Sequence, residues 1–202
     1  MYFHIQLIDD PEYPERRAQY REAHWEYFES HKDHFVARGA TLTDDMETYL
    51  SSVIFVEFDD WEAVSYFIDN EPLNQNGVYK KVAISCWHKA LERCQIDFPR
   101  EEGQSYWYIR GFGRANASNR RDELLELHRN YFSAYDENNF ITRGAVLDDA
   151  GEKWTGSANL IALPSRAQVD NFMANEPFYM DGLYDRVLIE RFKFGGRANQ
   201  LV

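Results

Sequence analysis

The sequence predicts an α+β fold built from two βαββαβ units that pack sheet to sheet within one chain of 202 residues. The main observation is a repeat: NEPLNQNGVYKKVAI at 70–84 returns as NEPFYMDGLYDRVLI at 175–189. Two further matches, ARGATL with TRGAVL and HWEYF with HRNYF, keep the same order at an offset of 104 or 105 residues. Segments that match in one order and at one spacing indicate two copies of one structural unit.

We place the first copy at residues 1–98, a linker at 99–104 and the second copy at 105–202. The intervening stretch FPREEGQS has the Pro, Gly and charged residues that are typical of linkers. Two such units can each bury the apolar surface that the other leaves exposed. We therefore expect an intramolecular pseudo-dimer that is monomeric, and the sequence leaves further oligomerisation open.

Each copy begins with a strand and a helix. In MYFHIQLI the apolar residues Phe3, Ile5 and Leu7 alternate with polar ones, which predicts a strand, and SYWYIRGF is its counterpart. The helix that follows has residues at i, i+4, i+7 and i+11 on one face. They are Tyr20, His24, Tyr27 and His31, with counterparts Leu124, His128, Tyr131 and Tyr135. One histidine in each copy should therefore face the sheet.

The rest of each copy predicts two strands, a helix and a last strand. A strand ends near RGATL or RGAVL, an acidic turn follows (TDDMET or DDAGEKWTG), and the next strand is SSVIFVEF or SANLIAL. Ser165 and Gln168 have the spacing of a helix capping box. Pro72 and Pro177 in the NEP motifs end the second helix, and GVYKKVAISCW or GLYDRVLIERF gives the last strand.

Composition limits the partners and the compartment. The formal net charge of -12 argues against nucleic acid or an anionic membrane as the main partner. The N-terminus is too short and too soon charged for a signal peptide, and no apolar run approaches the ~20 residues that span a bilayer. Cys86 and Cys94 form no disulfide framework. We expect a cytoplasmic protein with a small-molecule ligand or substrate.

The two histidines are the first candidates for chemistry. His24 and His128 occupy equivalent positions, and a half-buried imidazole passes protons near neutral pH. Asp44 and Asp149 align with each other in the acidic turns, so we predict the pairs His24–Asp44 and His128–Asp149, with aspartate orienting the ring. The alternatives are core histidines with local partners and solvated turn aspartates.

Arginines and tyrosines are candidates for holding the substrate. Arg38 and Arg143 precede the shared glycine and are predicted to bind an anionic group, or else to be surface charges at a strand edge. Tyr27 and Tyr131 are candidate substrate contacts, although core packing with a hydroxyl partner is the alternative. The glutamates of the NEP motifs are expected to cap or brace a turn.

No metal or cofactor is predicted. Cys pairs and an H-E-x-x-H pattern are missing from the sequence, as are G-x-S-x-G, a P-loop and a dinucleotide fingerprint. The common nucleophile and nucleotide classes are therefore removed from consideration.

The order of these motifs resembles the YciI-like (YCII-related) family of the dimeric α+β barrel superfamily. In the first copy the motif residues are Arg21, His24, Gly39, Asp44, Asp45, Ser51, Ser52, Glu71, Pro72, Gly77, Val78, Tyr79 and Trp87. In the second they are His128, Gly144, Asp148, Asp149, Gly156, Ser157, Glu176, Pro177, Gly182, Leu183, Tyr184 and Phe192. Both copies have Glu where the family usually has Asp before the proline, and the second has Leu125 in place of Arg21.

The resemblance implies a barrel of two ferredoxin-like units with a His–Asp active site, and a few relatives are similar to lactone isomerases and dehydrochlorinases. Two function classes follow. The first is a cofactor-independent enzyme that transfers protons on a small cyclic or aromatic metabolite, as an isomerase, hydrolase or dehydrochlorinase. The second is a non-catalytic module that binds a small molecule in the same clefts.

Overall fold

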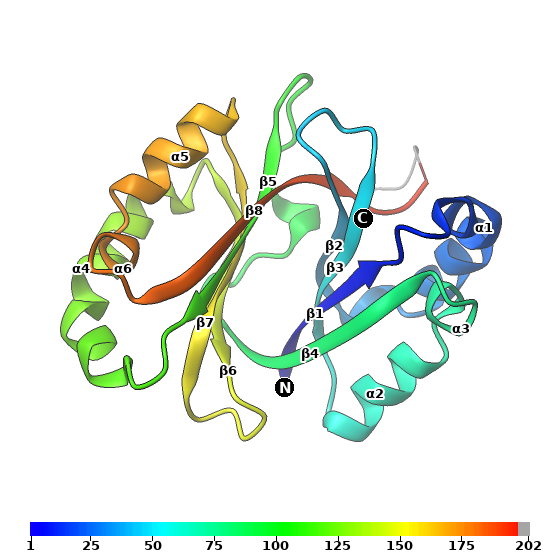
Figure 1. Cartoon of the computed structure of the whole chain (residues 1–202), viewed down its shortest axis with the longest axis horizontal. Helices are drawn as coiled ribbons and strands as arrows, with labels where there is room; N and C mark the ends of the chain where they lie inside the picture. Colours follow the sequence, from blue (N-terminus) through cyan, green and yellow to red (C-terminus); the bar gives the residue numbers. More distant parts are fainter. Residues whose placement is uncertain (198–202) are drawn as a thin grey trace.

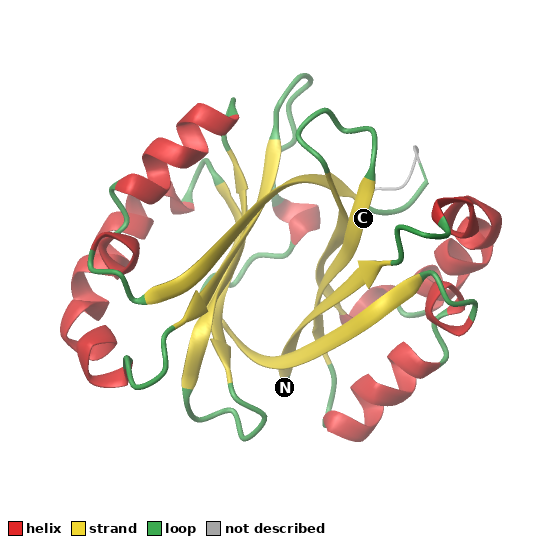
Figure 2. Cartoon of the chain, in the orientation of Figure 1, coloured by secondary structure: helices red, strands yellow, loops and turns green. Residues whose placement is uncertain are grey.

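The computed structural model describes residues 1–197, which form one closed barrel with helices on its outside (Figures 1 and 2). The first repeat contains β1 (Tyr2–Asp9), α1 (Pro14–Ser30), β2 (Phe35–Leu42), β3 (Tyr49–Glu57), α2 (Trp61–Asp69), α3 (Pro72–Gln75) and β4 (Tyr79–Lys89). The second contains β5 (Tyr106–Gly113), α4 (Ser118–Asp136), β6 (Phe140–Leu147), β7 (Trp154–Ala162), α5 (Arg166–Ala174), α6 (Pro177–Met180) and β8 (Tyr184–Phe194). Short 3-10 turns span Lys32–His34 and Gln95–Asp97.

The predicted fold class is confirmed: each repeat is a βαββαβ unit, to which the NEP motif adds the short helix α3 or α6. The barrel order is β1-β3-β2-β8-β5-β7-β6-β4, with all neighbours antiparallel. The repeats also join edge to edge, because β2 pairs with β8 and β4 pairs with β6.

The glycine shared by the RGA motifs lies at these two junctions. A Cβ on Gly39 would lie 2.3 Å from the carbonyl oxygen of Lys193, and a Cβ on Gly144 would lie 2.1 Å from that of His88. No side chain fits at either distance. Each repeat therefore keeps a glycine in this motif, because the last strand of the other repeat lies too close for any side chain.

Strand alternation divides the buried residues into layers. Phe3, Ile5 and Leu7 face α1 and α2 in an outer core, and an equivalent layer lies under α4 and α5. The opposite faces line the barrel interior, where Phe55, Trp87, Tyr108 and Phe192 contribute to a shared core. Within it, His4 of the first repeat hydrogen-bonds Tyr108, the residue at the same position of the second, over 2.8 Å.

The second helices begin at capped residues. Asp60 accepts a hydrogen bond from the backbone N–H of Ala63, and Ser165 accepts one from that of Gln168, as the sequence predicts for the latter. None of the helices in the described part of the chain is both long enough and apolar enough to cross a bilayer.

Candidate functional site

A buried histidine–glutamate pair lies between α1 and α3 of the first repeat. Helix α1 turns His24 and Phe28 inward, and the His24 ring contacts Phe28 with 4.1 Å between ring centroids. The Nδ1 atom of His24 lies 2.6 Å from Oε1 of Glu71, whose side chain is fully buried. The sheet-facing position predicted for His24 is confirmed.

The NEP motif explains why Glu71 is available at this place. Pro72 occupies the first helical position of α3 and keeps Glu71 in an extended conformation (φ -72°, ψ 124°), so Glu71 becomes the N-cap. Its carboxylate accepts hydrogen bonds from the backbone N–H groups of Leu73 (3.1 Å) and Asn74 (2.8 Å). Since both oxygens act as acceptors, Nδ1–H of His24 donates to Glu71. When the ring is neutral, this hydrogen bond leaves the lone pair on Nε2.

The second repeat builds the same pair from the same elements. His128 Nδ1 lies 2.6 Å from Oε1 of Glu176, and Glu176 accepts from the N–H groups of Phe178 and Tyr179 at the start of α6. The bracing role expected for the two glutamates is therefore confirmed. Their second role, as histidine partners, is not predicted from the sequence.

The predicted pairs His24–Asp44 and His128–Asp149 are wrong. The turns that carry the aspartates do not pack beside the histidine helices but reach across to the other repeat. Asp44 is exposed and forms an ion pair with Arg166 at the start of α5 (3.3 Å). The backbone carbonyl of Asp149 accepts from Nε1 of Trp61 on α2 (3.0 Å). Both aspartates thus belong to contacts between the repeats.

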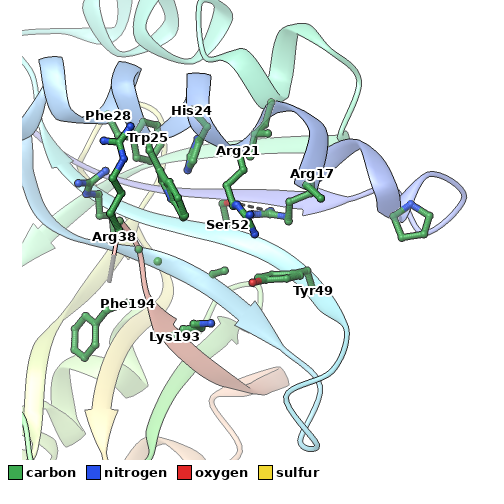
Figure 3. Close-up of a pocket in the computed structure, with 18 of the residues that line it drawn as sticks. Arg17, Arg21, His24, Trp25, Phe28, Arg38, Tyr49, Ser52, Lys193 and Phe194 are labelled. Atoms are coloured by element: carbon green, nitrogen blue, oxygen red, sulfur yellow. Dashed lines mark hydrogen bonds between the residues drawn. The ribbon is translucent and has the colours of Figure 1, made fainter. Parts of the chain in front are cut away.

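The space beside the two histidines differs. In the first repeat His24 lines a cavity of about 440 Å³, into which its ring extends from α1 (Figure 3). In the second repeat the cavity beside His128 measures about 70 Å³, and the Phe178 ring is stacked on the imidazole with 4.0 Å between centroids. Small-molecule sites usually need at least ~300 Å³, so only the first cavity admits a ligand larger than a few waters.

The two predicted arginines also differ in their partners. Arg143 forms a bidentate ion pair with Asp136, the last residue of α4, at 2.5 and 2.7 Å. Arg38 is only 2% exposed, and its Nη1 and Nη2 atoms have no hydrogen-bond partner within residues 1–197. Burial lowers the pKa of Arg38 to about 10, against the opposing effect of Glu29, so the guanidinium remains charged at neutral pH.

A polar network forms the wall of the cavity opposite Arg38. Arg17 makes a bidentate ion pair with Asp9 at 2.6 Å and donates to Ser52 Oγ at 2.9 Å, as Figure 3 shows for Ser52. Ser52 in turn hydrogen-bonds the Tyr79 hydroxyl, whose pKa burial raises. In the second repeat Ser157 hydrogen-bonds the Tyr184 hydroxyl in the same way (3.0 Å), but Gly113 stands where β1 has Asp9, so the ion pair with aspartate is not reproduced.

The tyrosines predicted to contact substrate do not line either cavity. Tyr27 donates its hydroxyl proton to the carbonyl of Phe67 (2.9 Å), and Tyr131 donates to that of Phe172 (2.8 Å). Each pins its first helix to its second helix, so the prediction of substrate contacts is wrong and the packing alternative is correct. Within the described residues, no group of three or more His, Cys, Asp and Glu side chains is placed to hold a metal ion.

Sequence reasoning missed the basic and aromatic residues that reach the first cavity from elsewhere in the chain. Lys193 and Phe194 come from β8 of the other repeat, where they pair with Ala40 and Gly39, and Arg100 comes from the predicted linker. The repeat alignment alone carries no signal for a contact across the barrel junction.

The closed barrel of two ferredoxin-like halves places the chain in the dimeric α+β barrel class. The family model of the YCII-related domain matches residues 1–88 and again residues 107–193, so the chain belongs to the YCII-related family, as a tandem repeat. None of the curated proteins matches the chain.

Solved structures extend the comparison of the fold. Chlorite dismutase from Candidatus Nitrospira defluvii is 10% identical with a TM-score of 0.59, and the match covers 95% of this chain and 90% of that one. A putative monooxygenase from Lactobacillus acidophilus is 9% identical with a TM-score of 0.55, over 95% and 92% of the two chains. A 5-chloro-2-hydroxyhydroquinone dehydrochlorinase from Burkholderia phenoliruptrix is 26% identical with a TM-score of 0.42, over 46% of this chain and 99% of that one.

Proposed function

We propose that the chain is a cofactor-independent enzyme in which His24 moves a proton to or from a small cyclic or aromatic substrate in the first cavity. The observation that carries the proposal is the His24–Glu71 contact of 2.6 Å beside a cavity of about 440 Å³. Isomerisation and elimination of HX require proton transfer at a carbon of the substrate, and hydrolysis requires a base that takes the proton of the attacking water.

The roles of the two residues follow from their hydrogen bonds. Glu71 fixes the ring orientation and the tautomer and stabilises the imidazolium that forms when Nε2 accepts a proton. The backbone N–H groups of α3 keep Glu71 an acceptor, so it orients the ring and does not take the proton itself. In this proposal His128 and Glu176 brace the second repeat and do not react.

A panel of small lactones, enolisable cyclic ketones and chlorinated hydroquinones tests the proposal. Deuterium incorporation from D₂O reports proton abstraction from carbon, chloride release reports elimination from the chlorinated members, and ring opening reports hydrolysis of the lactones. His24→Gln should lower the rate by ~10²–10⁴-fold, because glutamine keeps polarity and approximate size but does not titrate. His128→Gln is the matched control and should keep the wild-type rate.

The result also separates the enzyme from the non-catalytic binding module. A module would bind members of the panel without exchanging their protons or releasing chloride. Full activity in His24→Gln would overturn the assignment of the base. Equal losses in the two variants would show that both repeats contribute to the reaction.

A further inference from the structure

The lining of the first cavity includes a buried cationic group, the Arg38 guanidinium, whose Nη1 and Nη2 atoms receive no hydrogen-bond acceptor from the described chain. The Arg38 guanidinium lies against the rings of Phe28 and Phe35, with Cζ 5.2 and 4.7 Å from their centroids. These rings hold the group but offer no acceptor to Nη1 and Nη2. A buried charge without hydrogen bonds is unfavourable, and an anionic ligand would supply the hydrogen bonds that are missing here.

The lining of the cavity favours an anion as that ligand. It includes six basic side chains and no acidic one, although the chain as a whole has a net charge of -12. The basic residues are Arg17, Arg21, Arg38, Arg100, Lys193 and Arg197. Arg17 is paired with Asp9, and Arg197 with Glu22. A cleft lined by one sign of charge concentrates ligands of the opposite sign.

Three of the six basic side chains, Arg100, Lys193 and Arg197, come from the linker and the other repeat. Lys193 and Phe194 extend over the cavity from β8, which pairs with β2 beside Arg38 (Figure 3). At the position of Lys193, β4 offers the second cavity His88 instead. The second cavity is also lined by arginines (Arg121, Arg129 and Arg143), but it measures only about 70 Å³ and its lining has no lysine. The larger cationic cavity of the first repeat therefore depends on the tandem arrangement for part of its basic lining.

The distance between His24 and Arg38 limits the size of the ligand. The His24 ring lies 4.1 Å, and the Arg38 Cζ atom 5.2 Å, from the centroid of Phe28, so the two groups are at most about 9 Å apart. One ring with one anionic substituent spans this distance. Trp25, Phe28 and Phe194 supply apolar and aromatic walls for such a ring.

We propose that the first cavity selects a ring-sized carboxylate, with the carboxylate held by Arg38 and the ring placed beside His24. This deepens the proposed function and rests on it for the role of His24. Nη1 and Nη2 of Arg38 are buried in the wall of the cavity, so the side chain turns toward the cavity before its planar fork makes two parallel hydrogen bonds with the carboxylate. Arg21 and Lys193 add attraction, and the reacting C–H or ring substituent lies at the His24 end of the ligand.

Binding of benzoate to the full chain tests this proposal without any turnover. Benzamide is the neutral probe of the same shape, and inorganic phosphate is the tetrahedral anion. Titration calorimetry should give one benzoate site that is at least about tenfold tighter than benzamide or phosphate. Arg38→Met should remove at least about tenfold of the benzoate affinity, and Arg38→Lys should restore part of it, because lysine keeps the charge without the fork.

Arg143→Met is the matched control at the same position of the second repeat, and it should leave benzoate binding unchanged. Thermal unfolding provides a second measurement on the same variants, since benzoate should raise the Tm of the wild type and not that of Arg38→Met. Equal affinities for benzoate and benzamide would overturn the proposal. So would benzoate binding that Arg38→Met leaves intact, or that Arg143→Met weakens as strongly.

The two proposals fail in different ways. Benzoate binding that depends on Arg38, together with no proton exchange on any carboxylated probe, would uphold the anion site and reject the enzyme. Exchange that depends on His24 but is equally fast for neutral and carboxylated probes would uphold the enzyme and reject the anion site.

Discussion

The two repeats keep the same histidine–glutamate pair at the same distance, yet they differ in the partner of the nearby arginine and in the size of the cavity beside the histidine. Helix α4 runs to Asp136, which makes a bidentate ion pair with Arg143, whereas α1 ends at Ser30 and gives Arg38 the charge of Glu29 without an acceptor for Nη1 or Nη2. Phe178 covers His128 where the first repeat has Leu73. The histidine–glutamate pair is therefore compatible with a closed core as well as with an open cavity, and the surroundings decide which of the two forms.

The first prediction separates the structural role of the pairs from the chemical one. Glu71→Ala and Glu176→Ala should each lower the free energy of unfolding by roughly 3–5 kcal/mol, because each leaves a buried imidazole and two backbone N–H groups without an acceptor. Urea unfolding followed by tryptophan fluorescence measures the loss. The milder variants Glu71→Gln and Glu176→Gln should differ in activity alone, with only the first impaired. A much smaller loss of stability in one repeat would show that the two pairs are not equivalent braces.

The second prediction opens the closed cavity. Asp136→Ala removes the partner of Arg143, and Phe178→Leu gives the second repeat the residue that lies at this position in the first. The double variant should bind a second molecule of benzoate, within about a factor of ten of the first in affinity, because the fork of Arg143 is then free for a carboxylate. Calorimetric stoichiometry is the measurement, and each single variant is a control. A stoichiometry that stays at one would mean that other residues around His128, such as Trp154 and Asn159, close the cavity.

The third prediction concerns stability in the absence of ligand. Arg38→Met removes a buried guanidinium whose Nη atoms are unpaired and should raise the free energy of unfolding by about 1–2 kcal/mol. The lost contacts with Phe28 and Phe35 offset part of this gain. Arg143→Met should destabilise instead, since it leaves Asp136 without its ion pair. Opposite signs in urea unfolding would sharpen the contrast between the two arginines, and a destabilised Arg38→Met would contradict it.

The fold and the two histidines were predictable from the sequence because they depend on periodic patterns. Alternation in MYFHIQLI and helical spacing of His24 place residues on faces of elements, and the repeat doubles each signal. The carboxylate partners were not predictable in the same way, because the acidic turn and the NEP motif both recur at the same offset. The sequence signal for Glu71 as the histidine partner is the Glu–Pro pair. It marks the N-cap of a short helix, and the carboxylate at this N-cap is turned toward α1.

The difference between the cavities depends on contacts that no local pattern encodes. Arg38 and Arg143 occur in nearly identical sequences, ARGATL and TRGAVL, and the pairing of one of them depends on where the preceding helix ends. Lys193 reaches Arg38's cavity only because the barrel closes between β2 and β8. Such contacts belong to the tertiary arrangement and are visible only once the strand order is established.

The last prediction tests the position where the two repeats meet and differ, His4 against Tyr108. Burial, and to a lesser extent Arg110, lowers the pKa of His4 well below its ordinary value of 6.5. The unfolded chain therefore binds a proton below pH 6.5 that the folded chain does not accept, so this contribution to stability is complete above pH 6.5 and is lost as the pH falls. The loss approaches ~1.4 kcal/mol for each pH unit in this window.

His4→Gln can still hydrogen-bond the Tyr108 hydroxyl but does not titrate, so its free energy of unfolding should fall less steeply between pH 6.5 and 5 than that of the wild type. Urea unfolding at intervals of half a pH unit gives both curves, and the difference between them isolates His4 from the other histidines. Parallel curves would mean that His4 accepts a proton in the folded barrel, which would contradict its buried, neutral contact with Tyr108.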